Sequence, residues 1–335
     1  MKVLSLFDGI SCGRVALENI GISQSEYYAA EIDKYATTMS EKNYPDIIRL
    51  GDVTKWREWS IPWHEIDMVF AGFPCQAWSL AGKQLGDKDE RGMLFWTMLD
   101  IITHVKYMKR LFTGSDHVDF LIENVKMKKE FEEYITQHTE QALGTVYKTL
   151  INSALVSAQN RNRYYWTSWS VTQPEDRGVM LADIIEDGVG FIKSHGEMIK
   201  RNSKSQCLDA NYHKGVDNHG QRTVIKCGSM TGRRINPETG KRDDNNPDLK
   251  AVQRIELRSD NKTGTLTTVQ KDNYVVTAIT DGVSYRKLTP IECERLQGLP
   301  DNYTNHVSNT QRYKALGNGW QVTTVEHILK EYLNR

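Results

Sequence analysis

The sequence predicts an α/β protein with two parts: a doubly wound domain built on a parallel sheet, and a smaller, loop-rich, mainly β domain. Up to about residue 170, short apolar runs alternate with stretches of helical spacing, as in parallel sheets with crossover helices. After about residue 175, Gly, Asn, Asp, Lys and Arg dominate, and only short β-type runs recur. A chain of 335 residues is long enough for one large and one smaller domain.

The first part contains four apolar runs that predict strands and two stretches that predict helices. The strands are expected at Val3–Phe7, Tyr27–Ala30, Asp67–Ala71 and Val118–Ile122, and the helices from Gly13 and over Met93–Lys109. The strands are followed by Asp8-Gly9, Glu31, Gly72-Phe73-Pro74 and Glu123. Because the carboxyl ends of parallel strands meet at one edge of a sheet, these residues are expected to share the edge where such folds bind nucleotides.

The second part carries β-type runs at Arg222–Lys226, Gly264–Val269 and Tyr274–Thr277. They lie on both sides of a polar stretch between two prolines, which favours an ordered domain over a disordered insert. Helical patterns return from Tyr285. We therefore expect a first domain at 1–178, a second at 179–305 and a closing segment at 306–335 that returns to the first domain.

Composition excludes several protein classes. No apolar run is long enough to cross a membrane, and no basic region with a cleavable apolar segment opens the chain, so a cytoplasmic protein is expected. The five cysteines are scattered without a C-x-x-C pair, so neither a disulfide framework nor a metal site is expected. Net charge is zero, but residues 191–275 hold 16 Lys and Arg against 10 Asp and Glu. Charge alone favours a solvated surface there.

The first predicted strand ends in a turn suited to a nucleotide-like ligand. Gly9 permits a tight turn and close approach of a ligand to the backbone. Glu31 follows it by 22 residues, the spacing at which an acid binds ribose hydroxyls, and Asp52 is placed to accept a hydrogen bond from an adenine amino group. By itself this pattern is weak. The absence of G-x-G-x-x-G and G-K-[ST] disfavours dinucleotides and nucleoside triphosphates.

Cys75 follows a strand directly, after Gly72-Phe73-Pro74, at the edge predicted to bind the ligand. A thiolate held there can add to an electrophilic carbon. A lone cysteine is more often a buried structural residue, but the flanking proline and glycine argue against simple packing.

Glu123 also follows a strand, and Arg161 and Arg163 lead into the β-type run Tyr164–Trp166. Residues two apart point to the same side of an extended chain, so either arginine can reach a carbonyl oxygen in the same cleft. In isolation, a helix N-terminal acid and a surface basic pair remain the simpler interpretations.

Taken together and in order, these motifs resemble the cytosine-5 DNA methyltransferase family along nearly the whole chain. The motifs are SLFDGI, FPCQ, ENV, QNRNR, RKLTPIECERLQGLPDNYT and ALGNGWQVTTVEHI. CQAWSLAGKQLGDKDERGMLF is similar to the mobile catalytic loop of bacterial or phage restriction-modification enzymes. SLFDGI, RNRYYW and Trp320 are similar to the vertebrate de novo DNA methyltransferases. Residues 186–280 match no pattern and occupy the place of the family's target recognition region.

The chain departs from the family at two positions near the expected cofactor turn. Ser11-Cys12 stands where the family usually has paired glycines, and Gly317-Asn318-Gly319-Trp320 replaces GNS followed by a small apolar residue. These departures affect the expected shape of the cofactor pocket and leave the class unchanged.

The resemblance implies an S-adenosylmethionine-dependent Rossmann-like domain that methylates a cytosine flipped out of double-stranded DNA. Cys75 is expected to add to ring carbon 6, Glu123 to assist at ring nitrogen 3, and Arg163 to hold the exocyclic oxygen, with Arg161 supporting the loop. The expected cofactor residues are Phe7, Gly9, Ser11, Glu31, Ile32, Asp52, Val53, Pro74, Leu94, Asn318 and Trp320. The expected DNA contacts are Gln76, Ser79, Lys83, Gln84, Arg91, Arg233, Arg234, Lys241 and Arg242.

Three alternatives stay open at this point. One, suggested only by Gly319-Trp320, is an altered cofactor that transfers a group other than methyl. The other two concern the substrate and the activity. One is an RNA cytosine-5 methyltransferase acting on tRNA, although that branch typically has Pro-Pro-Cys and lacks a large recognition domain. The other is a non-catalytic DNA-binding relative, although such proteins usually lose the cysteine or glutamate motif. A monomer in the nucleoid is expected; whether a companion restriction endonuclease exists or the enzyme is solitary or of prophage origin is left open.

Overall fold

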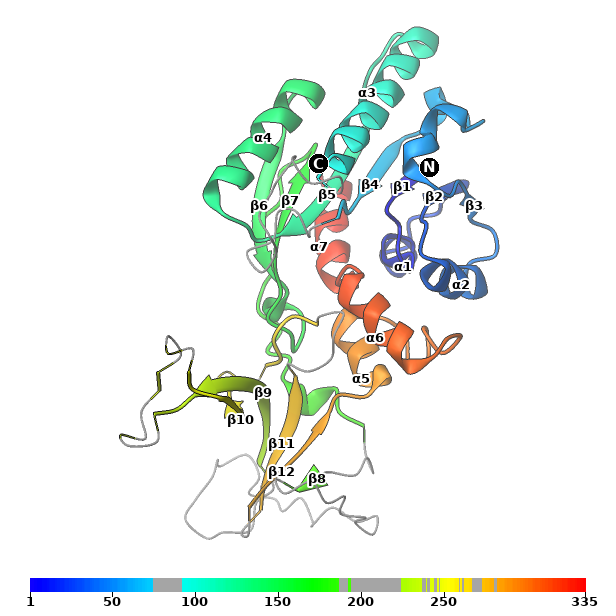
Figure 1. Ribbon diagram of the computed structural model, residues 1–335. Helices are drawn as coiled ribbons and strands as arrows, with labels where there is room; N and C mark the ends of the chain where they lie inside the picture. The colour runs from blue at the N-terminus through cyan, green and yellow to red at the C-terminus, as the bar shows by residue number, and fades with distance from the viewer. Residues whose placement is uncertain are drawn as a thin grey trace.

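The computed structural model contains a large α/β domain and a smaller β domain below it (Figure 1). It describes residues 1–74, 92–186, 192–193, 224–236, 239, 242–243, 246, 248–258, 260, 262–266, 273–279 and 282–335.

The large domain is built on a seven-stranded sheet with the order β3-β2-β1-β4-β5-β7-β6. Strands β1 to β5 pair in parallel, whereas β7 runs antiparallel to both β5 and β6. This arrangement confirms the predicted doubly wound α/β fold. The strands are β1 Lys2–Leu6, β2 Glu26–Ala30, β3 Ile48–Arg49, β4 Met68–Ala71, β5 Asp119–Val125, β6 Tyr147–Asn152 and β7 Asn162–Thr167.

Alternating apolar residues on the central strands bury both faces of this sheet. Val3 and Phe70 belong to the core on the side of α1, α2 and α7, whereas Leu4 and Val69 belong to the core on the side of α3 and α4. The helices are α1 Cys12–Asn19, α2 Lys34–Asn43, α3 Leu94–Thr113, α4 Lys129–Leu143, α5 Pro290–Gln297, α6 Asn309–Asn318 and α7 Val322–Leu333. Short 3-10 turns are η1 Val53–Glu58, η2 Trp63–Glu65, η4 Ser153–Leu155 and η5 Leu181–Asp183. In the described part of the chain, no helix is long and apolar enough to span a membrane.

The smaller domain is an antiparallel five-stranded sheet with the order β10-β9-β11-β12-β8. Its strands are β8 Ile192–Lys193, β9 Val224–Arg234, β10 Ala251–Leu257, β11 Tyr274–Ile279 and β12 Gly282–Lys287. The run predicted at Gly264–Val269 is not a strand over Gly264–Leu266, and residues 267–269 lie outside the described part. Instead, Thr263 exchanges backbone hydrogen bonds with Ala158 and Asn160 of the large domain, so this segment docks on the large domain.

A buried carboxylate joins the chain where it enters and leaves the smaller domain. Glu292 of α5 is fully buried and receives two hydrogen bonds from Arg286, at 2.6 and 2.7 Å. It also accepts from the backbone N–H groups of Glu186 and Thr289, both at 2.8 Å. Four donors satisfy this carboxylate, so the buried charge is fully paired. Glu292 thereby fixes Glu186, where the chain leads into the smaller domain, and Arg286, where it leaves that domain, against α5.

Candidate active site

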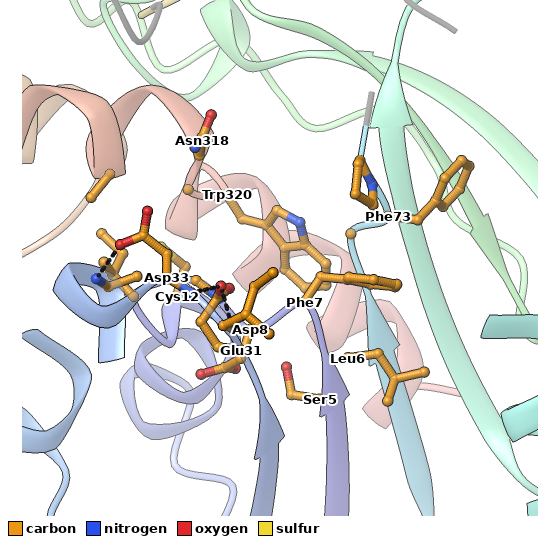
Figure 2. Close-up of a pocket in the computed structure, with 18 of the residues that line it drawn as sticks. Ser5, Leu6, Phe7, Asp8, Cys12, Glu31, Asp33, Phe73, Asn318 and Trp320 are labelled. Atoms are coloured by element: carbon orange, nitrogen blue, oxygen red, sulfur yellow. Dashed lines mark hydrogen bonds between the residues drawn. The ribbon is translucent and has the colours of Figure 1, made fainter. Parts of the chain in front are cut away.

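A cavity of about 420 Å³ lies at the carboxyl ends of β1, β2, β4 and β5. This is the sheet edge at which the sequence predicts a ligand. The closing segment, 306–335, covers the cavity with residues of α6 and of the stretch between α6 and α7. Apart from Ser11, every residue expected to contact the cofactor lines it: Phe7, Gly9, Glu31, Ile32, Asp52, Val53, Pro74, Leu94, Asn318 and Trp320. Figure 2 shows Phe7, Glu31, Asn318 and Trp320 at this cavity.

The turn after β1 is held by the acid that ends β2. Gly9 has φ +61°, a left-handed conformation that favours glycine, and its N–H donates to Glu31 at 2.8 Å. The other carboxylate oxygen of Glu31 accepts from the N–H groups of Ile32 and Asp33 at 2.8 and 2.7 Å. Glu31 is thus oriented by three backbone donors before any ligand binds.

Asp8, which the sequence does not single out, provides a second carboxylate in the cavity lining. It accepts hydrogen bonds from Tyr27 at 3.0 Å and from Ser11 at 2.5 Å. Burial raises the pKa of Asp8, while these hydroxyl donors act in the opposite direction. Ser11 itself does not line the cavity, because its left-handed backbone turns the fully buried hydroxyl toward Asp8 and Ser40.

Asp52 lies at the start of η1, in the turn that follows β3. Its carboxylate accepts from the backbone N–H and the hydroxyl of Thr54, at 2.9 and 2.8 Å, and these bonds lower the pKa of Asp52. Asp52 therefore presents an ionised carboxylate, which is a hydrogen-bond acceptor, in the cavity lining.

The closing segment brings Asn318 and Trp320 to the cavity from the end of α6. Trp320 packs edge-to-face on Phe70, with ring centroids 5.8 Å apart. It also lies against Gly72, where an added Cβ would be 2.7 Å from the indole nitrogen. The glycine after β4 therefore makes room for the tryptophan of the closing segment.

Glu123 and Arg163 form an ion pair in the lining of the same cavity, with Glu123 Oε1 2.9 Å from Arg163 Nε. Both side chains are buried, and antiparallel pairing of β5 with β7 brings them together. The neighbouring Asn124 donates to the carbonyl of Phe73 at 3.0 Å. Asn124, which sequence reasoning missed, thus fixes the chain just before Pro74 and Cys75.

Arg161 lines the cavity but makes its hydrogen bonds to the closing segment. Its guanidinium donates to the carbonyls of Gly317 and Gly319, at 3.3 and 2.8 Å. Gln297 at the end of α5 donates to the same Gly319 carbonyl at 3.3 Å and to that of Leu316. Burial, together with the nearby charge of Arg163, lowers the pKa of Arg161 to about 10, which leaves it cationic at neutral pH.

Several predicted residues fall outside the described part of the chain, namely Cys75, Gln76, Ser79, Lys83, Gln84, Arg91 and Lys241, as does the side chain of Arg233. Of the other predicted DNA contacts, Arg234 donates from Nε to the carbonyl of Leu249 at 3.0 Å. Arg242 is exposed and forms an isolated bridge with Ile235. Both lie in the smaller domain, away from the residues that line the cavity.

The charges of the cavity suit a cationic, adenosine-containing ligand. Among its described lining residues, Asp33 pairs with Lys314 and Glu123 with Arg163. Asp8, Glu31 and Asp52 are the other acidic side chains of that lining, and Arg161 is the other basic one. S-adenosylmethionine carries a sulfonium and an ammonium group together with ribose hydroxyls and an adenine amino group, all of which carboxylates bind.

Comparisons with known proteins agree with this geometry. The family model described as C-5 cytosine-specific DNA methylase matches residues 1–334. Type II methyltransferase M1.ScrFI of Lactococcus lactis subsp. cremoris is 29% identical, with 99% of this chain and 78% of that protein covered. Type II methyltransferase M.HhaI of Haemophilus parahaemolyticus is also 29% identical, over 98% and 93% of the two chains. Type II methyltransferase M.HpaII of Haemophilus parainfluenzae is 28% identical, over 99% and 89%.

Solved structures share the fold at lower identity. A DNMT2 of Spodoptera frugiperda superposes with a TM-score of 0.60 at 19% identity, covering 99% of both chains. The Dnmt2 methyltransferase of S. pombe gives 0.56 at 15%, covering 100% of this chain and 98% of that one. A match of the family model to nearly every residue shows that the chain belongs to the C-5 cytosine-specific DNA methylase family, whose members transfer a methyl group from S-adenosylmethionine to cytosine.

Proposed function

We propose that this enzyme flips one cytosine out of a specific site in duplex DNA and methylates it through a covalent adduct with Cys75. The observation that carries the proposal is the Glu123–Arg163 ion pair in the lining of the same cavity as Glu31 and Trp320. Pro74 lines this cavity too, and Cys75 is the next residue of the chain. A base reaching this point would meet the nucleophile, the acid and the arginine together.

The chemistry requires a nucleophile because ring carbon 5 of cytosine is itself a poor one. The Cys75 thiolate forms a bond to carbon 6, and the electron pair of the 5,6 double bond becomes available at carbon 5. Bound S-adenosylmethionine supplies the electrophilic methyl group. Carbon 5 then forms its bond to that methyl as the sulfonium–methyl bond breaks. Loss of the carbon 5 proton to a base and departure of the thiolate restore the aromatic ring.

Glu123 and Arg163 would assist this addition at neighbouring atoms on one edge of the ring, in keeping with their own contact at 2.9 Å. A protonated or hydrogen-bonded Glu123 at nitrogen 3 withdraws electrons and makes carbon 6 more electrophilic. Arg163 would hold the exocyclic oxygen, so the base would replace Glu123 as one of its partners. A cytosine inside a duplex is inaccessible to either group, so the base must leave the stack.

The antiparallel smaller domain is the proposed reader of the DNA sequence. Residues 191–275 carry an excess of Lys and Arg. In Figure 1 the smaller domain lies on the other side of α5 and α6 from the large domain. Arg234 and Arg242, together with Arg233 and Lys241, are proposed contacts with bases or phosphates. Five residues of the segment 76–91 are proposed as further DNA contacts, namely Gln76, Ser79, Lys83, Gln84 and Arg91.

Methyl transfer to two nucleic acids tests the proposal against an RNA substrate. The enzyme would be incubated with S-adenosylmethionine labelled in its methyl group and either mixed-sequence duplex DNA or tRNA. We expect label in the DNA and its recovery as 5-methylcytosine after hydrolysis. Label in tRNA alone would assign the enzyme to RNA, and label in neither would favour a non-catalytic DNA-binding protein.

A further inference from the structure

The two positions at which the sequence departs from its family lie in contact with each other. Cys12 begins α1 and is 3% exposed, and Gly319 follows α6 in the closing segment. A Cβ added to Gly319 would be 3.2 Å from the Cys12 sulfur and 3.3 Å from the carbonyl oxygen of Ala315. Both distances are shorter than ordinary van der Waals contact.

The backbone of Gly319 does not need glycine. Its φ of −64° and ψ of 157° are open to every residue type. Space is therefore the constraint, since the sulfur of Cys12 occupies the volume that a side chain at 319 would fill. A residue larger than glycine at 319 therefore displaces its neighbours, and a smaller residue at 12 removes the shorter of the two close contacts, leaving the one with the Ala315 carbonyl.

The Cys12 thiol has no role as a nucleophile in this position. Burial raises its pKa to about 12, the charge of Asp8 adds to the effect, and a backbone hydrogen bond from Trp320 opposes it. The thiol is consequently neutral at physiological pH and behaves as a small apolar group that also accepts the Trp320 N–H. It thus touches two consecutive residues of the closing segment.

We propose that Cys12 and Gly319 form a matched pair that sets the position of Trp320 and Asn318 in the cavity wall. Gly319 lies between these two lining residues, and Arg161 and Gln297 hold its carbonyl from the other side. A displaced Gly319 would move the Trp320 indole, which already lies tightly against Gly72. Cys12 and Gly319 are positioning residues in this proposal, which rests on the cavity being the S-adenosylmethionine site.

A four-protein cycle tests the pairing: the parent, Cys12→Ala, Gly319→Ala and the double variant. Overpacking at this buried position should displace Trp320 and Asn318, so Gly319→Ala should weaken S-adenosylmethionine binding about tenfold, measured by calorimetry. In the Cys12→Ala background the same change should cost less than about threefold, because the sulfur is gone. The KM for the cofactor should follow the dissociation constant, with kcat at saturating cofactor within about twofold of the parent.

Cys293→Ala provides the matched control, because Cys293 is the other described buried cysteine and is not among the atoms nearest to Gly319. It should not rescue Gly319→Ala. The unfolding temperatures of the same four proteins, measured without cofactor, test the Cys12–Gly319 contact even if the cavity does not bind S-adenosylmethionine. Equal costs of Gly319→Ala in both backgrounds, or rescue by Cys293→Ala, would overturn the pairing. Coupling in the unfolding temperatures without any cofactor binding by the parent would instead contradict the function of the cavity.

Discussion

The two walls of the cavity are built differently. On the wall formed by β1 and β2, Asp8 and Glu31 are held by backbone N–H groups and hydroxyls from the same stretch of chain. On the wall formed by β5 and β7, Glu123 pairs with Arg163, and Arg161 reaches the closing segment more than 150 residues away. The first wall presents preorganised acceptors to a ligand, whereas the second presents charged groups that can change partners during a reaction.

This contrast predicts that variants of the first wall raise the KM for S-adenosylmethionine, whereas variants of the β5–β7 wall lower kcat. Glu123→Gln should give the largest effect. Loss of a positioned acid should lower kcat by about 10²–10³-fold, with cofactor affinity within about twofold of the parent. Single-turnover methyl transfer to duplex DNA measures the loss in the rate of the chemical step, and calorimetry measures the affinity for S-adenosylmethionine. An unchanged kcat would remove Glu123 from the chemistry.

Glu31→Ala should act on binding. Removing a carboxylate that orients the turn at Gly9, and that we propose binds the ribose hydroxyls, should cost about 1.5–3 kcal/mol, or roughly 10–100-fold in the KM for S-adenosylmethionine. The value of kcat at saturating cofactor should change little. A loss of kcat with unchanged KM would place Glu31 on the reactive side and break the contrast between the walls.

Arg161→Met should raise the KM for the cofactor, although Arg161 lies on the β5–β7 wall, where other variants should lower kcat. Although Arg161 belongs to the same wall as Arg163, its partners are the carbonyls of Gly317 and Gly319. The change removes the Arg161 donor from the Gly317 carbonyl and leaves Gln297 as the remaining side-chain donor to Gly319, which should raise the KM for the cofactor about tenfold. Arg163→Met is the matched control and should lower kcat instead. Identical kinetic signatures for the two variants would refute the division of labour between them.

Asp8 should make cofactor binding depend on pH. Because burial raises its pKa, Asp8 becomes protonated at a higher pH than an exposed aspartate does, and it is fully ionised only above that raised value. Affinity for the cationic cofactor should therefore fall as pH decreases through the raised pKa. Asp8→Asn should bind a few-fold more weakly than the parent above that raised pKa and show a flatter profile. A parent and variant with parallel pH profiles would exclude this carboxyl as the titrating group.

Much of the fold could be predicted because it depends on local pattern. The runs around Val3 and Phe70 alternate or are wholly apolar, and each ends at a turn residue, so strands and their shared edge follow from the sequence. The spacing of Glu31 from Gly9 and the turn at Gly51-Asp52-Val53 likewise predict two residues that line the cavity. The docking of the segment around Thr263 on the large domain could not be predicted in this way, because the backbone of Thr263 and the hydroxyls of Thr263 and Thr265 bond to partners about 105 residues away.

The same limit applies to the site. Ser11 seemed part of the turn, but its left-handed backbone turns the hydroxyl inward. Asn124 and Gln297 stand inside the motifs ENV and RKLTPIECERLQGLPDNYT, but their roles could not be predicted, since they depend on carbonyls of distant segments at Phe73 and Gly319. Cys12 and Gly319 were visible only as separate departures from a family pattern, and their contact required the packed structure.

The most direct test of the central claim uses a duplex in which 5-fluorocytosine replaces cytosine at the methylated site. Fluorine at carbon 5 cannot leave as a proton, so the covalent adduct should persist after methyl transfer. With S-adenosylmethionine present, we predict a protein–DNA complex that survives denaturation, carries one added methyl group, and maps by mass spectrometry to the peptide containing Cys75. Methylation of ordinary duplex DNA without any such adduct, or an adduct on another residue, would contradict covalent catalysis by Cys75.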